Sequence, residues 1–233
     1  MRDGSASPRG VSAARRHQRL IASLLCAGWL SHTCAVAFPA HAAPNASSAH
    51  TSRWWKLTCR DALAPCVLVV RLRGVIDESR LKLLQEALRR RDTAQRSLGR
   101  TVALQVDIDS PGGKVFAALE IGRLLRREKA WARVGSGAAC ISACVFVLMG
   151  ATACEVAADA RIGLHSPSLG DRQRDTLVPA MSDQLVHYAE EMGVSRQIVE
   201  DMLAIPYSRM RFVTAAELAR YGVAVRPESS SRN

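Results

Sequence analysis

Aromatic side chains are scarce in this sequence, and they do not gather beside its basic residues. Phe, Trp and Tyr make up 5% of the 233 residues, while the excess of Lys and Arg gives a formal net charge of +11 at pH 7. A nucleic-acid platform needs a basic groove with stacking rings, but the arginine-rich segments 88–91 and 124–127 fall on the polar sides of expected helices. We therefore expect no nucleic-acid partner.

No apolar run in the sequence is long enough to span a membrane without interruption. Three arginines within 15–19 precede an apolar segment at 20–30, and polar residues from Ser31 onward interrupt it before about 20 residues are reached. Ala40 and Ala42 then provide an A-x-A cleavage site. The pattern predicts a signal peptide over 1–42 and a periplasmic or secreted protein, with an uncleaved membrane anchor as the alternative.

The sequence also lacks the cysteine and histidine spacing of a zinc site, so we expect no metal. Five cysteines lie beyond the predicted leader: Cys59, Cys66, Cys140, Cys144 and Cys154. Disulfides are permitted in an exported protein. We expect one between Cys59 and Cys66 around a short polar loop, and a second that links Cys154 to Cys140 or Cys144. The odd number leaves at least one cysteine without a partner in the same chain.

Beyond the leader, the pattern predicts a flexible tether at 43–56, a folded domain over 57–226 and a disordered tail at 227–233. Strands are expected at 66–72, 101–108, 132–135, 155–157, 161–164 and 210–213. Helices are expected after Asp77 and Ser142 and at 114–129, 175–192, 195–203 and 215–221. Strands that alternate with helices in this rhythm favour an α/β fold with a parallel sheet.

Three segments carry small or polar residues where predicted strands end. Asp-Ser-Pro-Gly-Gly occupies 109–113, a small-residue turn with Ser142 leads into an apolar helix, and Gly-Leu-His-Ser-Pro occupies 163–167. A serine at a strand-to-helix turn lies near free backbone N–H groups, which stabilise negative charge developing on a substrate. Ser142 is therefore the candidate nucleophile.

His165 is the candidate base, because a neutral imidazole with a pKa near ~6.5 can remove a serine proton at neutral pH. The N–H groups of Gly112 or Gly113 and of Ala143 would face the oxygen of a tetrahedral intermediate, since glycine allows close approach. Each residue alone has an ordinary explanation as a turn, a helix cap or a structural histidine. The hypothesis depends on the three segments occurring together.

These motifs, followed by Arg-Phe-Val-Thr-Ala-Ala-Glu-Leu-Ala-Arg-Tyr-Gly-Val at 211–223, resemble the ClpP class of serine peptidases. The resemblance is closest to its exported, single-domain relatives and runs from about Val67 to Val225. Each motif alone is weak, but four in the family's order are fairly specific. The resemblance implies the ββα spiral fold that ClpP shares with signal peptide peptidase A and the crotonases.

The resemblance implies that Ser142 is the nucleophile, His165 the base and the Pro-Gly-Gly backbone at 111–113 the oxyanion hole. It implies a serine endopeptidase that forms an acyl-enzyme and needs neither metal nor nucleotide. Without ATP-driven unfoldases outside the membrane, we expect short or unfolded peptides as substrates, and a homo-oligomer is left open. Cys140 and Cys144 lie two residues either side of the serine and are either structural or rival thiol nucleophiles.

Met210 stands where the family carries the aspartate that orients the base. A missing carboxylate leaves the imidazole tautomer less well fixed, unless Asp201, Ser208 or a backbone carbonyl replaces it. A carboxylate restored by Met210→Asp is then expected to raise kcat by about 10-fold. The alternatives to a peptidase are a weak or inactive ClpP-like binding protein and a crotonase-type acyl-CoA enzyme.

Overall fold

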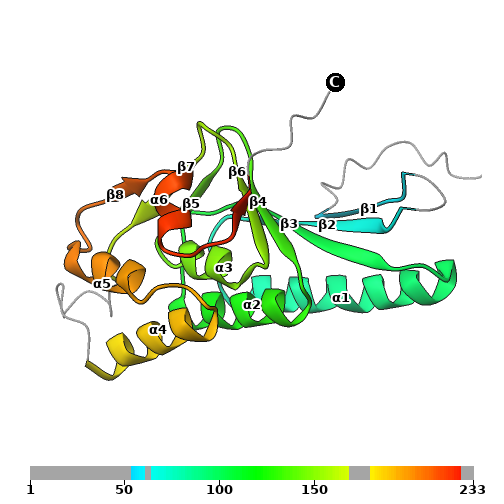
Figure 1. Ribbon diagram of the computed structural model, residues 1–233. Helices are drawn as coiled ribbons and strands as arrows, with labels where there is room; N and C mark the ends of the chain where they lie inside the picture. The colour runs from blue at the N-terminus through cyan, green and yellow to red at the C-terminus, as the bar shows by residue number, and fades with distance from the viewer. Residues whose placement is uncertain (1–53, 61–63, 168–178, 227–233) are drawn as a thin grey trace, which may run out of the picture. The chain divides into compact units, whose positions relative to one another are not determined.

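The computed structural model describes residues 54–60, 64–167 and 179–226 (Figure 1). The predicted signal peptide, most of the predicted tether and the predicted tail lie outside these ranges. By its internal contacts the chain divides into residues 1–49 and 50–233, and all described residues belong to the second unit. None of the helices described there is long and apolar enough to cross a membrane.

The larger of two sheets has six strands in the order β1-β2-β3-β4-β6-β9. Their bounds are Trp55–Thr58 (β1), Cys66–Arg73 (β2), Val102–Asp109 (β3), Trp131–Val134 (β4), Ala153–Val156 (β6) and Val225–Arg226 (β9). β1 pairs antiparallel with β2, and every other neighbouring pair is parallel. Along β2 and β3 every second residue is fully buried, as expected for a sheet with one face against helices.

The smaller sheet has three strands in the order β5-β7-β8. Their bounds are Ala139–Ile141 (β5), Arg161–Leu164 (β7) and Arg211–Val213 (β8). β4 and β6 belong to the larger sheet, whereas β5 and β7, which follow them in sequence, belong to the smaller one, and a helix follows each pair. This repeat of two strands and a helix is the ββα arrangement that the motifs implied, and the predicted α/β class is confirmed.

Helices α1 (Glu78–Leu98) and α2 (Val115–Arg127) lie side by side along the larger sheet (Figure 1). α1 begins at its predicted cap, where the Asp77 carboxylate accepts a hydrogen bond from the backbone N–H of Ser79 at 2.9 Å. It ends at Gly99, whose φ of +60° is the left-handed conformation that glycine adopts readily. Local sequence therefore sets both ends of the longest helix.

Helix α3 (Cys144–Gly150) is buried along its whole length and contacts α2 through a pair of glycines. A Cβ on Gly150 would lie 2.3 Å from the Cα of Gly122, and a Cβ on Gly122 would lie 1.8 Å from the hydroxyl oxygen of Tyr188. That hydroxyl donates a hydrogen bond to the carbonyl of Phe146 at 2.7 Å. The short helix is therefore held closely on two sides.

Three further helices complete the described chain: α4 (Pro179–Glu191), α5 (Gln197–Ala204) and α6 (Ala215–Arg220). α6 begins with the predicted capping box, because Thr214 Oγ1 accepts from the N–H of Glu217 at 3.2 Å and the Glu217 carboxylate accepts from the N–H of Thr214 at 2.8 Å. This cap ends β8 and turns the chain back towards β9 in the larger sheet.

Strands β1, β5 and β9 occur in the structure but were not predicted from the sequence. They have four, three and two residues, and pairing with a neighbouring strand defines them more than any local pattern does. β1 starts at Trp55, within the segment predicted as tether. The strands and helices that were predicted do occur, with their ends displaced by a few residues.

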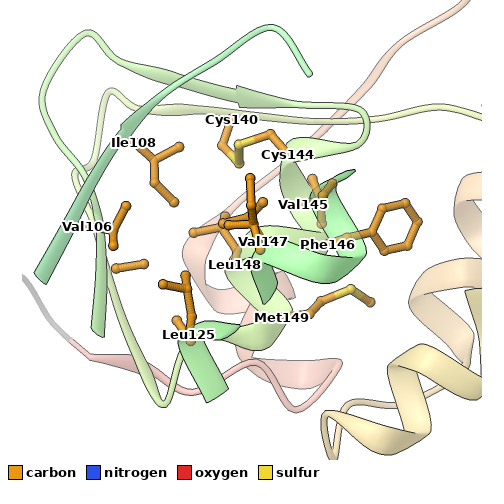
Figure 2. Packing of buried hydrophobic residues seen from close by; sticks show 14 of the residues in the cluster. Val106, Ile108, Leu125, Cys140, Cys144, Val145, Phe146, Val147, Leu148 and Met149 are labelled. Carbon is orange, nitrogen blue, oxygen red and sulfur yellow. A yellow bond between two sulfur atoms is a disulfide. The ribbon is translucent and has the colours of Figure 1, made fainter. Parts of the chain in front are cut away.

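Two disulfides occur among the described cysteines, and one of them differs from the prediction. Cys59 and Cys66 are bonded as predicted. The predicted link from Cys154 to Cys140 or Cys144 is wrong, because the turn between β5 and α3 brings the Cα atoms of Cys140 and Cys144 to 5.2 Å and these two residues bond to each other (Figure 2). Cys154 is a buried free thiol, and burial raises its pKa to about 12.

This pairing can be checked by peptide mapping of the oxidised protein. We expect one linked peptide pair for Cys59 and Cys66 and another for Cys140 and Cys144. Cys154 should resist alkylation until the protein is unfolded, because a buried, protonated thiol is a poor nucleophile. Mass spectrometry with alkylation before and after denaturation measures all three. A linked peptide that contains Cys154 would contradict the assignment.

Candidate active site

The register of the smaller sheet brings two of the predicted site segments together. β5 and β7 pair in parallel with Ile141 opposite Gly163. The N–H of Ser142 continues this pairing and donates to the carbonyl of Gly163 at 2.8 Å. Ser142 and His165 therefore follow the carboxyl ends of neighbouring parallel strands, the edge of a sheet at which ligands commonly bind.

The Ser-Pro-Gly-Gly segment lies against the same turn. The N–H of Ser110 donates to the carbonyl of Ala139 at 2.7 Å, and the N–H of Ile141 donates to the carbonyl of Ser110 at 3.1 Å. A Cβ on Gly112 would lie 2.9 Å from the Cβ of Ser142. The structure thus brings all three predicted segments together, and glycine is the residue that fits beside the serine.

Ser142 itself has a backbone conformation that few serines adopt. Its φ is +58°, and among the non-glycine residues that the structure describes only Lys129 also has a positive value. A residue in the left-handed region costs on the order of 1–3 kcal/mol and persists where its surroundings enforce it. Ser142 remains partly exposed. The turn therefore presents a strained serine to solvent at the end of β5.

Two backbone donors beside this serine have no hydrogen-bond acceptor among the described residues: the N–H groups of Gly113 and Ala143. The N–H of Gly112, by contrast, donates to Ser110 Oγ at 3.0 Å. Gly113 has φ +147°, and a Cβ there would lie 2.2 Å from the carbonyl oxygen of Ile76. Of the two predicted glycine donors, only Gly113 is therefore free to bind an oxyanion.

His165 is held by the main chain that follows it. Its side chain is buried, with 6% of its surface exposed, and Nδ1 lies 2.9 Å from the carbonyl oxygen of Ser166. A carbonyl can only accept, so Nδ1 carries the proton and Nε2 keeps its lone pair when the ring is neutral. Burial lowers the pKa of His165 below its ordinary value of 6.5. The ring is therefore neutral at pH 7, as a base must be.

The side chains of Ser142 and His165 are not hydrogen-bonded to each other in the part of the chain that the structure describes. Hydrogen bonds between catalytic groups are often long without substrate and tighten when it binds.

The two cysteines that flank the serine are bonded to each other. Neither is therefore a thiol nucleophile in the oxidised protein.

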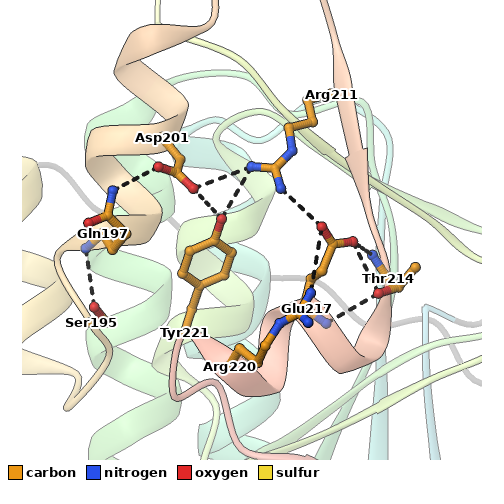
Figure 3. A network of polar contacts seen from close by, with 8 residues as sticks. All are labelled: Ser195, Gln197, Asp201, Arg211, Thr214, Glu217, Arg220 and Tyr221. Carbon is orange, nitrogen blue, oxygen red and sulfur yellow. Dashed lines mark hydrogen bonds and ion pairs between the residues drawn. The ribbon is translucent and has the colours of Figure 1, made fainter.

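Asp201, one of the predicted replacements for the missing aspartate, is engaged elsewhere (Figure 3). Its carboxylate accepts hydrogen bonds from the hydroxyl of Tyr221, from Gln197 Nε2 at 2.8 Å and from Arg211 Nη1 at 3.3 Å. The Tyr221 hydroxyl is the main cause that lowers the pKa of Asp201. Arg211 also donates to Glu217 at 3.0 Å. This network joins α5, β8 and α6. Asp201 is therefore bound within it, and the imidazole of His165 has a different hydrogen-bond partner.

The other two predicted replacements are separated by the structure. Ser208 is exposed, whereas the backbone carbonyl that reaches the imidazole belongs to Ser166. Sequence reasoning named a carbonyl only in general terms. It also missed Tyr207, whose ring meets that of His165 edge-on with centroids 5.1 Å apart. Pro206 and the aromatic residue after it were the available signal for a turn at this place.

Met210, which stands in the sequence where the resemblance implies an aspartate, packs against Gly163 of the smaller sheet. It is 38% exposed, and its Sδ would lie 2.6 Å from a Cβ added to Gly163.

No group of three or more metal-ligating side chains occurs among the described residues. A shallow groove of about 400 Å³ lies instead against the Asp201 network, lined by Ser195, Gln197, Arg211, Glu217, Arg220 and Tyr221.

Comparison with known proteins identifies the family of this chain. A family model described as Clp protease matches residues 96–226, which is more than half of the chain and includes every predicted site motif. The chain belongs to the Clp protease family. The match confirms the resemblance found in the motifs and places this Clp-family chain among serine-type peptidases at the general level. No curated protein matches it.

Solved structures similar to this Clp-family chain include further proteases. A lysine-to-alanine mutant of the 1510-N membrane-bound stomatin-specific protease, in complex with a substrate peptide, aligns with a TM-score of 0.54 and 22% identity over 68% of this chain and 74% of that one. ClpP1 from Listeria monocytogenes aligns with a TM-score of 0.52 and 16% identity over 71% and 94%. These likenesses confirm the ClpP-like fold.

The environment of His165 predicts how reaction at Ser142 depends on pH. Because burial lowers the pKa of the imidazole, the ring stays neutral until the pH falls below 6.5. Labelling of Ser142 by a fluorophosphonate should therefore be constant near pH 7 and should fall at lower pH with a midpoint below 6.5. Initial labelling rates between pH 4.5 and 8 measure this midpoint. A midpoint above 6.5 would contradict the role of burial.

The contact between His165 and Ser166 changes the expectation for Met210→Asp. The expected gain in kcat assumed an imidazole without a partner at Nδ1, whereas the Ser166 carbonyl already holds that proton. We now expect kcat to change by less than about threefold, although a triad carboxylate can contribute up to ~10⁴ where it is the orienter. Steady-state kinetics of the folded variant test this, with Met210→Leu as the size-matched control. A gain above 10-fold would show that the carbonyl orients the base poorly.

Proposed function

We propose that the protein is an exported serine endopeptidase of the ClpP type, which cleaves peptide bonds with Ser142 as nucleophile and His165 as base. The observation that carries this proposal is the strained Ser142, with φ +58°, which follows β5 and is held between Gly112, after β3, and Gly163 of β7. Strain of this kind clusters at functional sites. The membership of the Clp protease family gives the chemistry its class.

In the acylation step, Ser142 Oγ attacks the carbonyl carbon of a peptide bond while His165 Nε2 takes the hydroxyl proton. The carbonyl oxygen becomes negatively charged, and the free N–H groups of Gly113 and Ala143 donate to it. When the intermediate collapses, the C–N bond breaks and Nε2 gives its proton to the leaving amine. The first product leaves, and the acyl group remains on Ser142.

In the deacylation step, water takes the place of the amine. His165 Nε2 removes a proton from this water as its oxygen attacks the acyl carbon, and the same two N–H groups stabilise the new oxyanion. Collapse breaks the bond to Ser142 Oγ, which recovers the proton from Nε2. Every proton that enters the imidazole leaves it again, so Ser142 and His165 return to their starting states after each turnover.

The carbonyl of Ser166 supplies the orientation that the family's aspartate would give. It fixes the proton of His165 on Nδ1 at 2.9 Å and keeps the lone pair on Nε2. A neutral carbonyl stabilises the imidazolium less than a carboxylate does. We therefore expect slower turnover than in a complete triad, and an acidic limb of the pH–activity profile that lies at lower pH than a carboxylate-paired histidine would give.

Export is the remaining part of the proposal. The two disulfides, Cys59–Cys66 and Cys140–Cys144, support an oxidising compartment, where such bonds persist. The predicted signal peptide at 1–42 supports the same location. Outside the cytoplasm no ATP-driven partner would unfold substrates, so the expected substrates are short or unfolded peptides.

The test is labelling by a fluorophosphonate, combined with cleavage of an unfolded, fluorescently labelled protein such as casein. Ser142→Ala should abolish labelling, and Ser142→Ala and His165→Ala should each lower turnover by about 10³-fold or more. The double variant should be no worse than either single one, because nucleophile and base act together. His187→Ala, an exposed histidine on α4, is the control and should retain full activity.

Other outcomes would identify a different function. A folded wild-type protein that neither labels nor cleaves peptides would indicate a ClpP-like binding protein. Turnover of an acyl-CoA that survives Ser142→Ala would indicate a crotonase-type enzyme, which shares the oxyanion hole but does not need the serine. Full peptide turnover by Ser142→Ala would contradict the serine mechanism itself.

A further inference from the structure

The Cys140–Cys144 disulfide spans the candidate nucleophile symmetrically. Cys140 is the middle residue of β5, Cys144 is the first residue of α3, and Ser142 lies two residues from each. Both cysteines are fully buried, and Figure 2 shows their bond at the edge of the apolar cluster that includes Ile108 and Val145. The bond therefore closes a small ring with the serine at its middle.

The conformation of Ser142 needs such support. Its left-handed backbone is unfavourable for a residue with a Cβ and reverts unless neighbouring contacts hold it. Two hydrogen bonds do so directly: the serine N–H donates to Gly163, and its carbonyl accepts from the N–H of Val145 at 3.0 Å. The first reaches the four-residue strand β7 and the second the seven-residue helix α3, both short elements. A covalent bond between β5 and α3, the elements on either side of the serine, fixes their separation.

We propose that the Cys140–Cys144 disulfide is a positioning device for Ser142, which holds the turn between β5 and α3 in the one conformation that aims the hydroxyl at a bound peptide. This inference rests on the proposed function of Ser142 as nucleophile. It assigns to the two cysteines an effect on the rate of the serine's reaction, beyond the stability that a disulfide gives to any fold.

The chain contains a matched control for the stability effect. The Cys59–Cys66 bond spans seven residues and the Cys140–Cys144 bond four, so the chain-entropy model gives them similar stabilisation. Cys66 pairs with Val102 at the amino end of β3, whereas the site follows the carboxyl end of that strand. Loss of the first bond should therefore lower stability without moving Ser142.

The experiment compares Cys140→Ala/Cys144→Ala with Cys59→Ala/Cys66→Ala in fluorophosphonate labelling. For each folded variant the maximal labelling rate and the probe concentration for half of that rate are measured well below the melting temperature. We expect the maximal rate to fall by roughly 10- to 100-fold in the first variant, because small misplacements of a reacting group cost about that much. The second variant should stay within about twofold of wild type.

The pH dependence separates positioning from general damage. The midpoint of labelling belongs to His165, whose contact with Ser166 lies in the segment directly after β7. We expect this midpoint to be the same in wild type and in Cys140→Ala/Cys144→Ala while the plateau rate falls. A lower plateau with an unchanged midpoint indicates that the serine moved and the base did not.

Reduction gives the same comparison without removing a side chain, and it decides the matter if Cys140→Ala/Cys144→Ala fails to fold. In the Cys59→Ala/Cys66→Ala background only one described disulfide remains. A water-soluble phosphine gives two electrons to that S–S bond and becomes its oxide with oxygen from water, and the two hydrogens of the water form the two thiols. Reduction in urea followed by dilution reaches the buried bond, and alkylation with mass analysis measures completeness.

Each outcome decides between the two proposals. Slower labelling of the reduced, refolded protein, restored by reoxidation with oxidised glutathione, supports the positioning role. Labelling at the full rate without the Cys140–Cys144 bond overturns that role and leaves the serine mechanism intact, as does an equal loss of rate in Cys59→Ala/Cys66→Ala. A wild-type protein that never labels overturns the proposed function, and the positioning role with it.

Discussion

The parallel pairing of β5 with β7 is the contact on which the candidate site depends. It sets Ile141 opposite Gly163. Ser142, one residue beyond Ile141, and His165, two residues beyond Gly163, therefore emerge at the same edge of the smaller sheet. Because side chains alternate along a strand, a slip of one residue would turn the serine or the histidine away. The bonds from Ser110 to both ends of β5 add the glycine turn to this register. The geometry of the candidate site is thus set by main-chain hydrogen bonds.

Much of this arrangement could be predicted because its causes are local. The cap at Asp77, the capping box of Thr214 and Glu217, and the alternation of strands with amphipathic helices all depend on residues close in sequence. The order of the motifs carried the fold class, and the positions of Ser142 and His165 relative to strand ends followed from it. These are features that a single sequence records directly.

The features that escaped prediction depend on the shape of turns and on main-chain pairing, which residue types mark poorly. The pairing of Cys140 with Cys144 required the shape of the turn, which the sequence alone did not give, and β1 and β9 exist because a neighbouring strand offers hydrogen bonds. The partner of the base is a carbonyl, which every residue has, so no side chain marked Ser166 as its source. Three replacements for the missing aspartate were predicted, and the folded structure places only the carbonyl within reach of the imidazole.

The glycine contact between α2 and α3 has a consequence for how this site can adapt to different peptides. At Gly122 and Gly150 the two helices touch backbone to backbone, with no side chains between them that could repack. The distance between α2 and α3, the helix that follows Ser142, is therefore fixed. The exposed side chains of Tyr207, Met210 and Phe212, by contrast, rise from a loop and the edge strand β8 beside His165 and Gly163. Differences in peptide preference among relatives of this protein should accordingly arise at these exposed positions, where a side chain can change without disturbing the helix that follows the candidate nucleophile.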